Sequence, residues 1–277
     1  MKRSVVFLAA MLLSAVSWAQ SSQAEFKAKY DRQVKVVGYD GVGVSFVLDK
    51  WEEAFPEDPS MLEARFKYDY LKSKTTKVVI KDQERYLGQK PVLNLADSTG
   101  KKHNYFEDLE FDDELFGTAQ QFIDKALKVS PLELRFRFDK ISSLLEYEKE
   151  SPDMATAQLQ SLIDQNASSH PAWTFDGEPM DKDEFAACIQ EYCNKYFQIG
   201  SKTSLEQFKT LSEKMNKLFP KESVFLTNIG SYWLIAQKND KKAAAMYKKA
   251  LKVNPEDAAA QQNLKLIEKR KAQAKKK

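Results

Sequence analysis

Four of the nine prolines in this chain follow a helical segment at one recurring spacing. Each proline comes twelve, eight and five residues after three positions, which in the two clearest copies hold a small, a large and a small residue. Positions four and then three residues apart share one face of a helix, and proline cannot continue a helix. This pattern predicts helices that pack closely on a neighbour and then end. The two clearest copies are Ala243, Tyr247, Ala250 and Pro255, and Ala119, Ile123, Ala126 and Pro131.

The other two copies keep the spacing but depart from the pattern of residue sizes. One is Val47, Trp51, Ala54 and Pro59, and the other is Phe208, Ser212, Met215 and Pro220. Because large residues occupy positions that favour small ones, packing is expected to be looser or differently angled at both.

The spacing resembles the second helix of a tetratricopeptide (TPR) repeat. In the last repeat the first helix fits as well, because Leu226, Ile229-Gly230 and Trp233 match the family's pattern of W, then L-G, then Y. The resemblance implies an all-α, TPR-like superhelical solenoid of antiparallel helix pairs that holds an extended or helical peptide. The chain also resembles exported TPR proteins common in Bacteroidetes, which carry a signal peptide and strand insertions.

The repeat positions fix the phase of a run of helices along the chain. They are expected at residues 22–36, 44–55, 60–73, 112–129, 132–149, 152–166, 181–198, 204–219, 222–237, 240–253 and 255–270. The expected organisation is a signal peptide (1–19), N-terminal helices (20–74), a strand-containing insertion (75–111), further helices (112–167), an aromatic loop (168–180), and C-terminal repeats with a capping helix and basic tail (181–277).

Two segments interrupt the helical pattern. In the first, Val78–Ile80 and Pro91–Leu95 predict short strands around a turn at Asp97–Gly100, a β-hairpin-like insertion. In the second, Asp176-Gly177 lies between aromatic flanks and favours a tight turn. Insertions in repeat proteins often lie on the binding face.

Trp173 and Phe175 of the second segment are candidate residues for partner binding. Aromatic side chains on a loop can anchor a peptide or a glycan. Alternatively, both fold back over the hydrophobic face of the helices. If Trp173 is a contact residue, Trp173→Ala weakens binding and leaves helicity intact, whereas loss of cooperative folding assigns it to the core.

The loop from Gly38 to Gly43, which carries Tyr39, is the third candidate. Its backbone N–H groups could hold an anion ahead of a helix, or its glycines could supply a turn with positive φ. A segment from Phe106 to Glu114 holds six acids among aromatic residues. It could attract a basic peptide or calcium, or Asp112 and Asp113 could favour the start of the next helix.

The first nineteen residues have the pattern of a secretory signal peptide. Lys2 and Arg3 precede an apolar stretch from Val5 to Leu13, and small residues flank Trp18 ahead of cleavage after Ala19. An N-terminal membrane anchor is the alternative, although the apolar stretch is shorter than the ~20 residues that span a bilayer. An exported, periplasmic location is expected, with no integral membrane span.

Charge is distributed unevenly along the chain. The full chain carries +3, of which residues 265–277 contribute +6, so the mature body is mildly acidic. This balance argues against nucleic-acid binding. The basic end predicts a weak contact with an anionic surface, or is a solvated helix end.

No set of residues indicates catalysis. The sequence has no nucleophile elbow, phosphate-binding loop or zinc-protease motif, and it holds two histidines. Cys188 and Cys193 lie five apart on an expected helix, too far for a disulfide. We therefore expect no enzyme, metal or cofactor, but a scaffold for a protein or peptide partner, an adaptor or assembly factor in the cell envelope. The alternatives are a glycan- or peptide-ligand module for envelope polysaccharide, and a self-assembling scaffold.

Overall fold

The structure, a computed structural model, describes residues 23–274. The expected signal peptide, its cleavage site and the last three lysines lie outside these residues. The chain divides into two compact units. The first takes residues up to Lys77 together with Asp108–Ser143, and the second takes Val78–Glu107 together with Leu144 onward.

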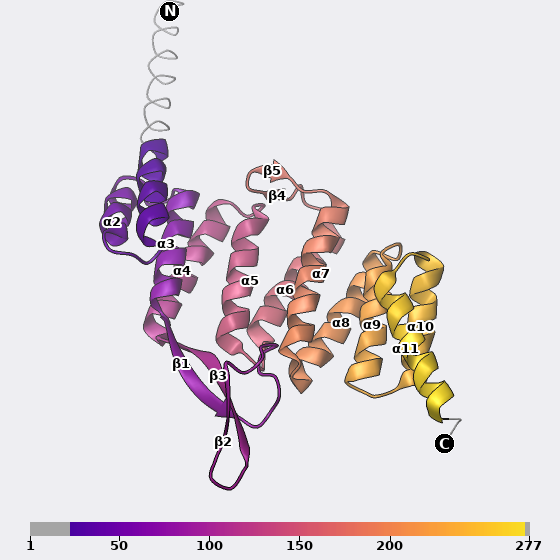
Figure 1. Cartoon of the computed structure of the whole chain (residues 1–277). Coiled ribbons are helices and arrows are strands. Elements are labelled where there is room, and N and C mark those ends of the chain that lie inside the picture. The colour runs from indigo at the N-terminus through magenta and orange to yellow at the C-terminus, as the bar shows by residue number, and fades with distance from the viewer. Residues whose placement is uncertain (1–22, 275–277) are drawn as a thin grey trace, which may run out of the picture. The chain divides into compact units, whose positions relative to one another are not determined.

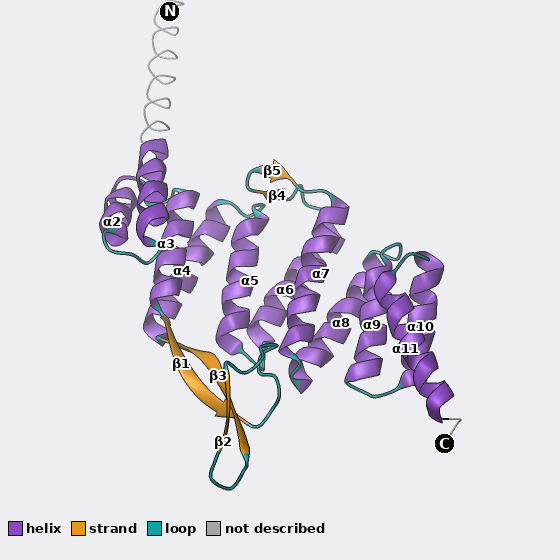
Figure 2. Ribbon diagram, viewed as in Figure 1, coloured by secondary structure: helices purple, strands orange, loops and turns teal. Residues whose placement is uncertain are grey.

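The predicted fold class is confirmed: the chain consists of TPR-like antiparallel helix pairs with small strand insertions (Figures 1 and 2). Each expected helix is present, with ends displaced by a few residues. After a first helix at residues 23–37 come α2 (Val44–Ala54), α3 (Pro59–Lys72), α4 (Asp113–Val129), α5 (Leu134–Glu148), α6 (Asp153–Ser169), α7 (Lys182–Ile199), α8 (Lys202–Leu218), α9 (Ser223–Ile235), α10 (Asp240–Val253) and α11 (Ala258–Ala274).

In the first unit, α3 packs against both α2 and α4. The three residues that precede Pro131 at the recurring spacing, Ala119, Ile123 and Ala126, are fully buried in one cluster with residues of α2 and α3. The small residues allow helix axes to approach, while Ile123 fills the space between them.

The copy that precedes Pro59 departs from the expected phase. Its Trp51 is buried, but Ala54 is exposed and Val47 is only partly buried. The buried face of α2 instead holds Val44, Leu48 and Trp51. Trp51 fixes this face because its indole Nε1 donates a 2.9 Å hydrogen bond to Asp58 Oδ2.

In the second unit, the helices from α7 to α11 pack one on the next in chain order. Ala243, Tyr247 and Ala250 of α10 are fully buried. Gly230 lies where α9 crosses α10, and Trp233 is partly buried against the same core. The weak copy in α8 is also well packed, since Ser212 and Met215 are fully buried and Phe208 is 2% exposed.

Side chains at the helix starts account for many of the observed boundaries. Asp112 accepts hydrogen bonds from the backbone N–H groups of Glu114 and Leu115, so the acidic segment does begin α4. Asp181 and Glu184 form a reciprocal capping box at the start of α7. Asp58 caps α3, whose first residue is Pro59.

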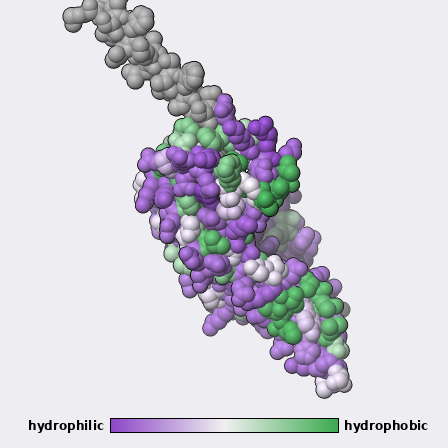
Figure 3. All heavy atoms as spheres, turned by 90° about the vertical axis from the view of Figure 1, so that its left-hand side faces the viewer, coloured by the Kyte–Doolittle hydropathy of each residue, from purple (hydrophilic) through white to green (hydrophobic). Residues whose placement is uncertain are grey.

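The first insertion is a three-stranded sheet with the order β1–β3–β2. Its strands are β1 (Lys74–Lys81), β2 (Leu93–Ala96) and β3 (Lys102–Phe111), and Leu93 lies opposite Tyr105 in the antiparallel β2–β3 pair. The sequence did not predict β3, because the acids of this segment obscured its alternation. Four apolar side chains of the sheet are about half exposed or more: Val78, Ile80, Leu93 and Leu95. Hydrophobic residues gather near the lower end of the molecule in Figure 3, at the height of the sheet.

The second insertion is the two-residue pair β4 (Thr174–Phe175) and β5 (Glu178–Pro179). Asp176 and Gly177 both have positive φ, 53° and 81°, as the predicted tight turn requires. No helix among residues 23–274 is long and apolar enough to cross a membrane.

Candidate functional site

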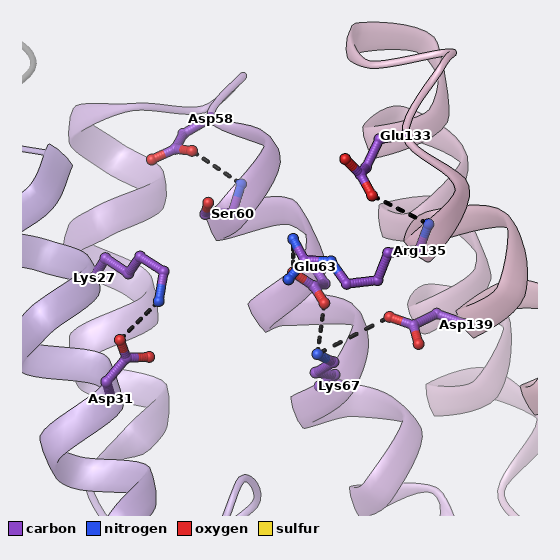
Figure 4. Close-up of polar contacts among 9 residues, drawn as sticks. All are labelled: Lys27, Asp31, Asp58, Ser60, Glu63, Lys67, Glu133, Arg135 and Asp139. Carbon is purple, nitrogen blue, oxygen red and sulfur yellow. Dashed lines mark hydrogen bonds and ion pairs between the residues drawn. The ribbon is translucent and has the colours of Figure 1, made fainter. Parts of the chain in front are cut away.

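A polar pocket of about 190 Å³ lies in the first unit, between the first helix and α3. Three elements supply its charges. The first helix contributes Lys27 and Asp31, α3 contributes Glu63 and Lys67, and α5 contributes Arg135 (Figure 4). Tyr30, Tyr39 and Trp51 line the same space. We call it the Tyr30 pocket.

The glycine-rich loop places Tyr39 at this pocket. Gly38 and Gly43 have φ values of 84° and 85°, a conformation in which a side chain is strained. Gln33 Nε2 closes the turn with a 2.8 Å hydrogen bond to the carbonyl oxygen of Val42. This loop is therefore a turn between two helices, which is the second of the two alternatives given for it above. Tyr39 is 43% exposed, and Lys67 Nζ lies 5.8 Å from the centre of its ring.

Glu63 is the centre of the charged network. Its side chain is 7% exposed, yet both carboxylate oxygens have a basic partner. Lys67 Nζ lies 2.5 Å from Oε1, and Arg135 Nη2 lies 2.9 Å from Oε2. Lys67 also faces Asp139 of α5, with 4.0 Å between Nζ and Oδ2. A buried carboxylate is stable only when paired in this way, so Glu63 ties α3 to α5.

The environment shifts two pKa values in this network. Burial raises the pKa of Asp139 to about 6, and the negative charge of nearby Glu63 adds to the shift, against the positive charge of Lys67. Burial lowers the pKa of Lys67, but the charge of Glu63, its hydrogen bond to Lys67 and the charges of Asp139 and Tyr39 together outweigh burial, and the pKa is raised. Lys67 is therefore a permanent cation, whereas Asp139 can change its charge close to neutral pH.

Tyr30 is a buried residue of the pocket with a hydroxyl group that is unsatisfied within residues 23–274. Its side chain packs against the Trp51 ring and is 6% exposed, but its hydroxyl has no hydrogen-bond partner within the described part of the chain. Burial raises the pKa of Tyr30, and the charges of Tyr39, Glu63 and Asp31 act in the same direction, so the phenol keeps its proton. Because a buried polar group without a partner is costly, a ligand atom that accepts from Tyr30 would be stabilising.

A second pocket, of about 400 Å³, lies in the second unit beside the aromatic loop. Trp173, Met180, Phe185 and Phe219 supply apolar walls, and Lys182 and His170 supply polar groups. Trp173 is 3% exposed, and its Nε1 donates a 3.1 Å hydrogen bond to Asn166 Oδ1. Of the two alternatives for Trp173, an exposed contact residue or a residue that folds back over the helices, the structure shows the second: Trp173 folds back onto α6. Phe175 is 36% exposed at the tip of β4.

The three predicted partner-binding residues do not form one site. Tyr39 lines the pocket of the first unit, Trp173 lines that of the second, and Phe175 lines neither. The sequence analysis missed Tyr30, Glu63, Lys67, Arg135 and Asp139. A signal for them was present, because Lys27/Asp31, Glu63/Lys67 and Arg135/Asp139 are opposite charges four residues apart in three successive first helices of a pair.

No protein-family model matches the chain, and no curated protein matches it. Among solved structures, it is similar to YrrB, described as a TPR protein with an unusual peptide-binding site. The two are 14% identical, with 92% of this chain and 87% of the other covered and a TM-score of 0.38.

A second similar structure is MamA, residues 41 to the end, from Desulfovibrio magneticus RS-1. It is 13% identical, with 85% of this chain and 97% of the other covered and a TM-score of 0.39. The TPR-like character of the chain follows from its own helix pairs and from the small residues buried where those pairs meet.

Proposed function

We propose that this protein is a TPR-type interaction scaffold that holds a segment of a partner protein at the Tyr30 pocket. One observation carries the proposal: Tyr30 lines a charged pocket, and its buried hydroxyl has no hydrogen-bond partner among residues 23–274. A volume of about 190 Å³ accommodates one polar side chain or a chain terminus rather than a large cofactor.

The scaffold acts as an adaptor or assembly factor in the cell envelope in this proposal. The signal-peptide pattern of the first nineteen residues supports export to the periplasm. The basic C-terminal segment, which includes Lys265, Lys269, Arg270 and Lys271 of α11, supports a weak contact with an anionic surface.

Site-directed photocrosslinking in the native host tests this function. A photoreactive phenylalanine analogue replaces Tyr39, which is partly exposed and lines the pocket. The same analogue at Val253, which is 40% exposed on α10, is the control position. Mass spectrometry then identifies the crosslinked protein and the residue attached.

We expect one saturable crosslink from position 39 that is absent from position 253. Tyr30→Phe removes one hydroxyl and should weaken the crosslink. Tyr247→Phe is the matched variant, because Tyr247 is a buried tyrosine of the second unit whose hydroxyl lies 3.2 Å from Ser231 Oγ. Equal crosslinking in both variants, or no crosslink from position 39, would overturn the proposal.

A glycan- or peptide-ligand module is the second candidate function. The pocket of about 400 Å³ beside Trp173 favours it, because aromatic walls with a few polar groups suit a sugar ring or an apolar side chain. A shift in tryptophan fluorescence across a glycan panel would support this function. No shift across the panel would exclude it.

A further inference from the structure

The side chains joined by ion pairs around the Tyr30 pocket carry equal positive and negative charge when every acid is ionised, and Glu133 adds one further acid, because its Oε1 accepts a hydrogen bond from the backbone N–H of Arg135. Three basic side chains, Lys27, Lys67 and Arg135, meet three acids, Asp31, Glu63 and Asp139. Lys27 and Asp31 pair with each other at 2.7 Å, which leaves Lys67 and Arg135 with Glu63 and Asp139. One proton added to this inner group of four leaves it with one positive charge.

Asp139 is the member of the group that can take up that proton. Glu63 has a basic partner within 2.9 Å on each oxygen, so its ionised form is held on both sides. Asp139 has a longer contact, 4.0 Å from Oδ2 to Lys67 Nζ, and Oδ2 accepts no hydrogen bond from any residue that the structure describes. The weaker pairing makes ionised Asp139 the least stable charge of the four.

The pocket also offers donors for an anion. Tyr30 has a hydroxyl proton without a partner among residues 23–274, and Glu63 accepts a hydrogen bond from the Lys67 ammonium, which has further N–H groups to donate. An anion in the pocket and the ionised Asp139 would both need the positive charge of Lys67 as their partner. Binding of the anion therefore favours the neutral form of Asp139.

We propose that the Tyr30 pocket binds an oxyanion, such as a carboxylate, together with one proton, and that Asp139 holds this proton. The proposal rests on the proposed function in one respect, since the anion would belong to the bound partner. It adds that binding strengthens as the solution becomes more acidic.

The sign and size of the effect follow from linkage. Burial raises the pKa of Asp139 to about 6, and the charges that face it are Glu63 and Lys67 from α3 and Arg135 from its own helix. At pH 5 most molecules hold the proton, whereas at pH 7 roughly one in ten does, so the apparent affinity falls about tenfold between them. Above pH 7 the fall approaches tenfold for each pH unit.

Small oxyanions of known charge test the proposal on the full mature chain. The probes are sulfate, N-acetylglutamate α-amide and N-acetylglycine, titrated at constant ionic strength from pH 5.5 to pH 8, where all three remain ionised. The first stands for an inorganic ion, the second for an acidic side chain and the third for a chain terminus. NMR of 13C-labelled aspartate carboxyl groups reports the protonation of Asp139 directly.

Three variants separate the roles. Asp139→Asn should bind with the low-pH affinity at every pH. Tyr30→Phe should bind several-fold more weakly but keep the pH dependence. Asp69→Asn is the matched control: burial also raises the pKa of Asp69 to about 6, but the charges that face Asp69 are Arg65 and Glu52 rather than Lys67 and Glu63, so the pH dependence should remain.

The expected result is tighter binding at pH 5.5 than at pH 7, with the Asp139 titration moved to higher pH by a saturating probe. Binding that is equally strong across this range, or a pH dependence that survives Asp139→Asn, would overturn the inference. A pH dependence lost in Asp69→Asn instead would assign the proton elsewhere and also overturn it. Failure of the Tyr39 crosslink with intact pH-linked anion binding would reject the proposed function alone.

Discussion

Gly230 of α9 lies directly against the ring of Tyr247 of α10. A Cβ atom added at Gly230 would come within 2.6 Å of Tyr247 Cε1 and 2.8 Å of Cδ1. Tyr247 is fully buried, so its ring has little room to move. Gly230 therefore leaves room for Tyr247, the large central residue of the repeat, and sets how closely α9 and α10 approach.

Gly230→Ala should destabilise the protein in spite of alanine's better helix propensity. Alanine in a helix interior gains about 1 kcal/mol over glycine, but overpacking of a filled core costs about 1–3 kcal/mol. We expect a net loss, measured as a lower urea midpoint at an unchanged slope.

Gly117→Ala in α4 is the control, because no atom lies within 4 Å of its added Cβ. This variant should be slightly more stable than the wild type, by roughly 0.5–1 kcal/mol. If both variants gain stability, α9 and α10 do not approach as closely as described.

Trp173→Ala should lower stability rather than only remove a contact with a partner. Trp173 is 3% exposed and donates its indole proton to Asn166, so truncation leaves a cavity and a lost hydrogen bond. Buried tryptophan-to-alanine changes cost about 3–5 kcal/mol. Thermal unfolding followed by circular dichroism measures the loss.

Phe175→Ala, at the tip of the same loop, serves for comparison. Because the side chain is 36% exposed, its removal should change the free energy of unfolding by no more than about 1 kcal/mol. A larger loss of stability from Phe175→Ala than from Trp173→Ala would mean that Phe175, and not Trp173, belongs to the hydrophobic core.

The helices were predictable from sequence because their signals are local. Proline, capping residues and apolar positions three and four apart act within one helix, as the complete burial of Ala243, Tyr247 and Ala250 illustrates. Strand β3 was missed because Glu107, Asp108 and Glu110 interrupt its apolar pattern.

The Tyr30 pocket could not be assembled from sequence in the same way. Tyr30, Glu63 and Arg135 lie on three helices, and only their packing brings them together. Charged and polar residues on an amphipathic helix usually face solvent, so the residue types alone do not single these three out. Tyr39 was singled out for its glycine loop, and the loop does place it at the pocket.

The two cysteines should react at very different rates. Cys193 is fully buried, and burial raises the pKa of its thiol to about 12, while Cys188 is partly exposed, with its pKa also raised by burial and then by Glu184 and Glu191. Because the thiolate is the reactive form, a thiol reagent should modify Cys188 slowly and Cys193 only on unfolding. Mass spectrometry of the labelled protein, with and without urea, measures both rates. Rapid labelling of Cys193 in the native protein would show that α7 opens locally.

Asp69→Asn should stabilise the protein at neutral pH but not in acid. Burial raises the pKa of Asp69 from 3.8 to about 6, although the positive charge of Arg65 opposes the shift. Between these two values the folded state binds more protons than the unfolded state, so this residue's contribution to stability falls as the pH rises through that window. Above it, ionised Asp69 costs about 1–3 kcal/mol, which the neutral asparagine removes.

Urea unfolding at pH 4 and pH 8 measures this difference for Asp69→Asn. We expect the variant to exceed the wild type at pH 8 and to match it at pH 4. Asp164→Asn is the control, because Asp164 is 66% exposed in a surface ion pair with Lys214, and exposed pairs contribute about 0–1 kcal/mol. An equal gain at both pH values would mean that asparagine improves packing or hydrogen bonding in α3. In that case the raised pKa of Asp69 would not be the source of the stabilisation.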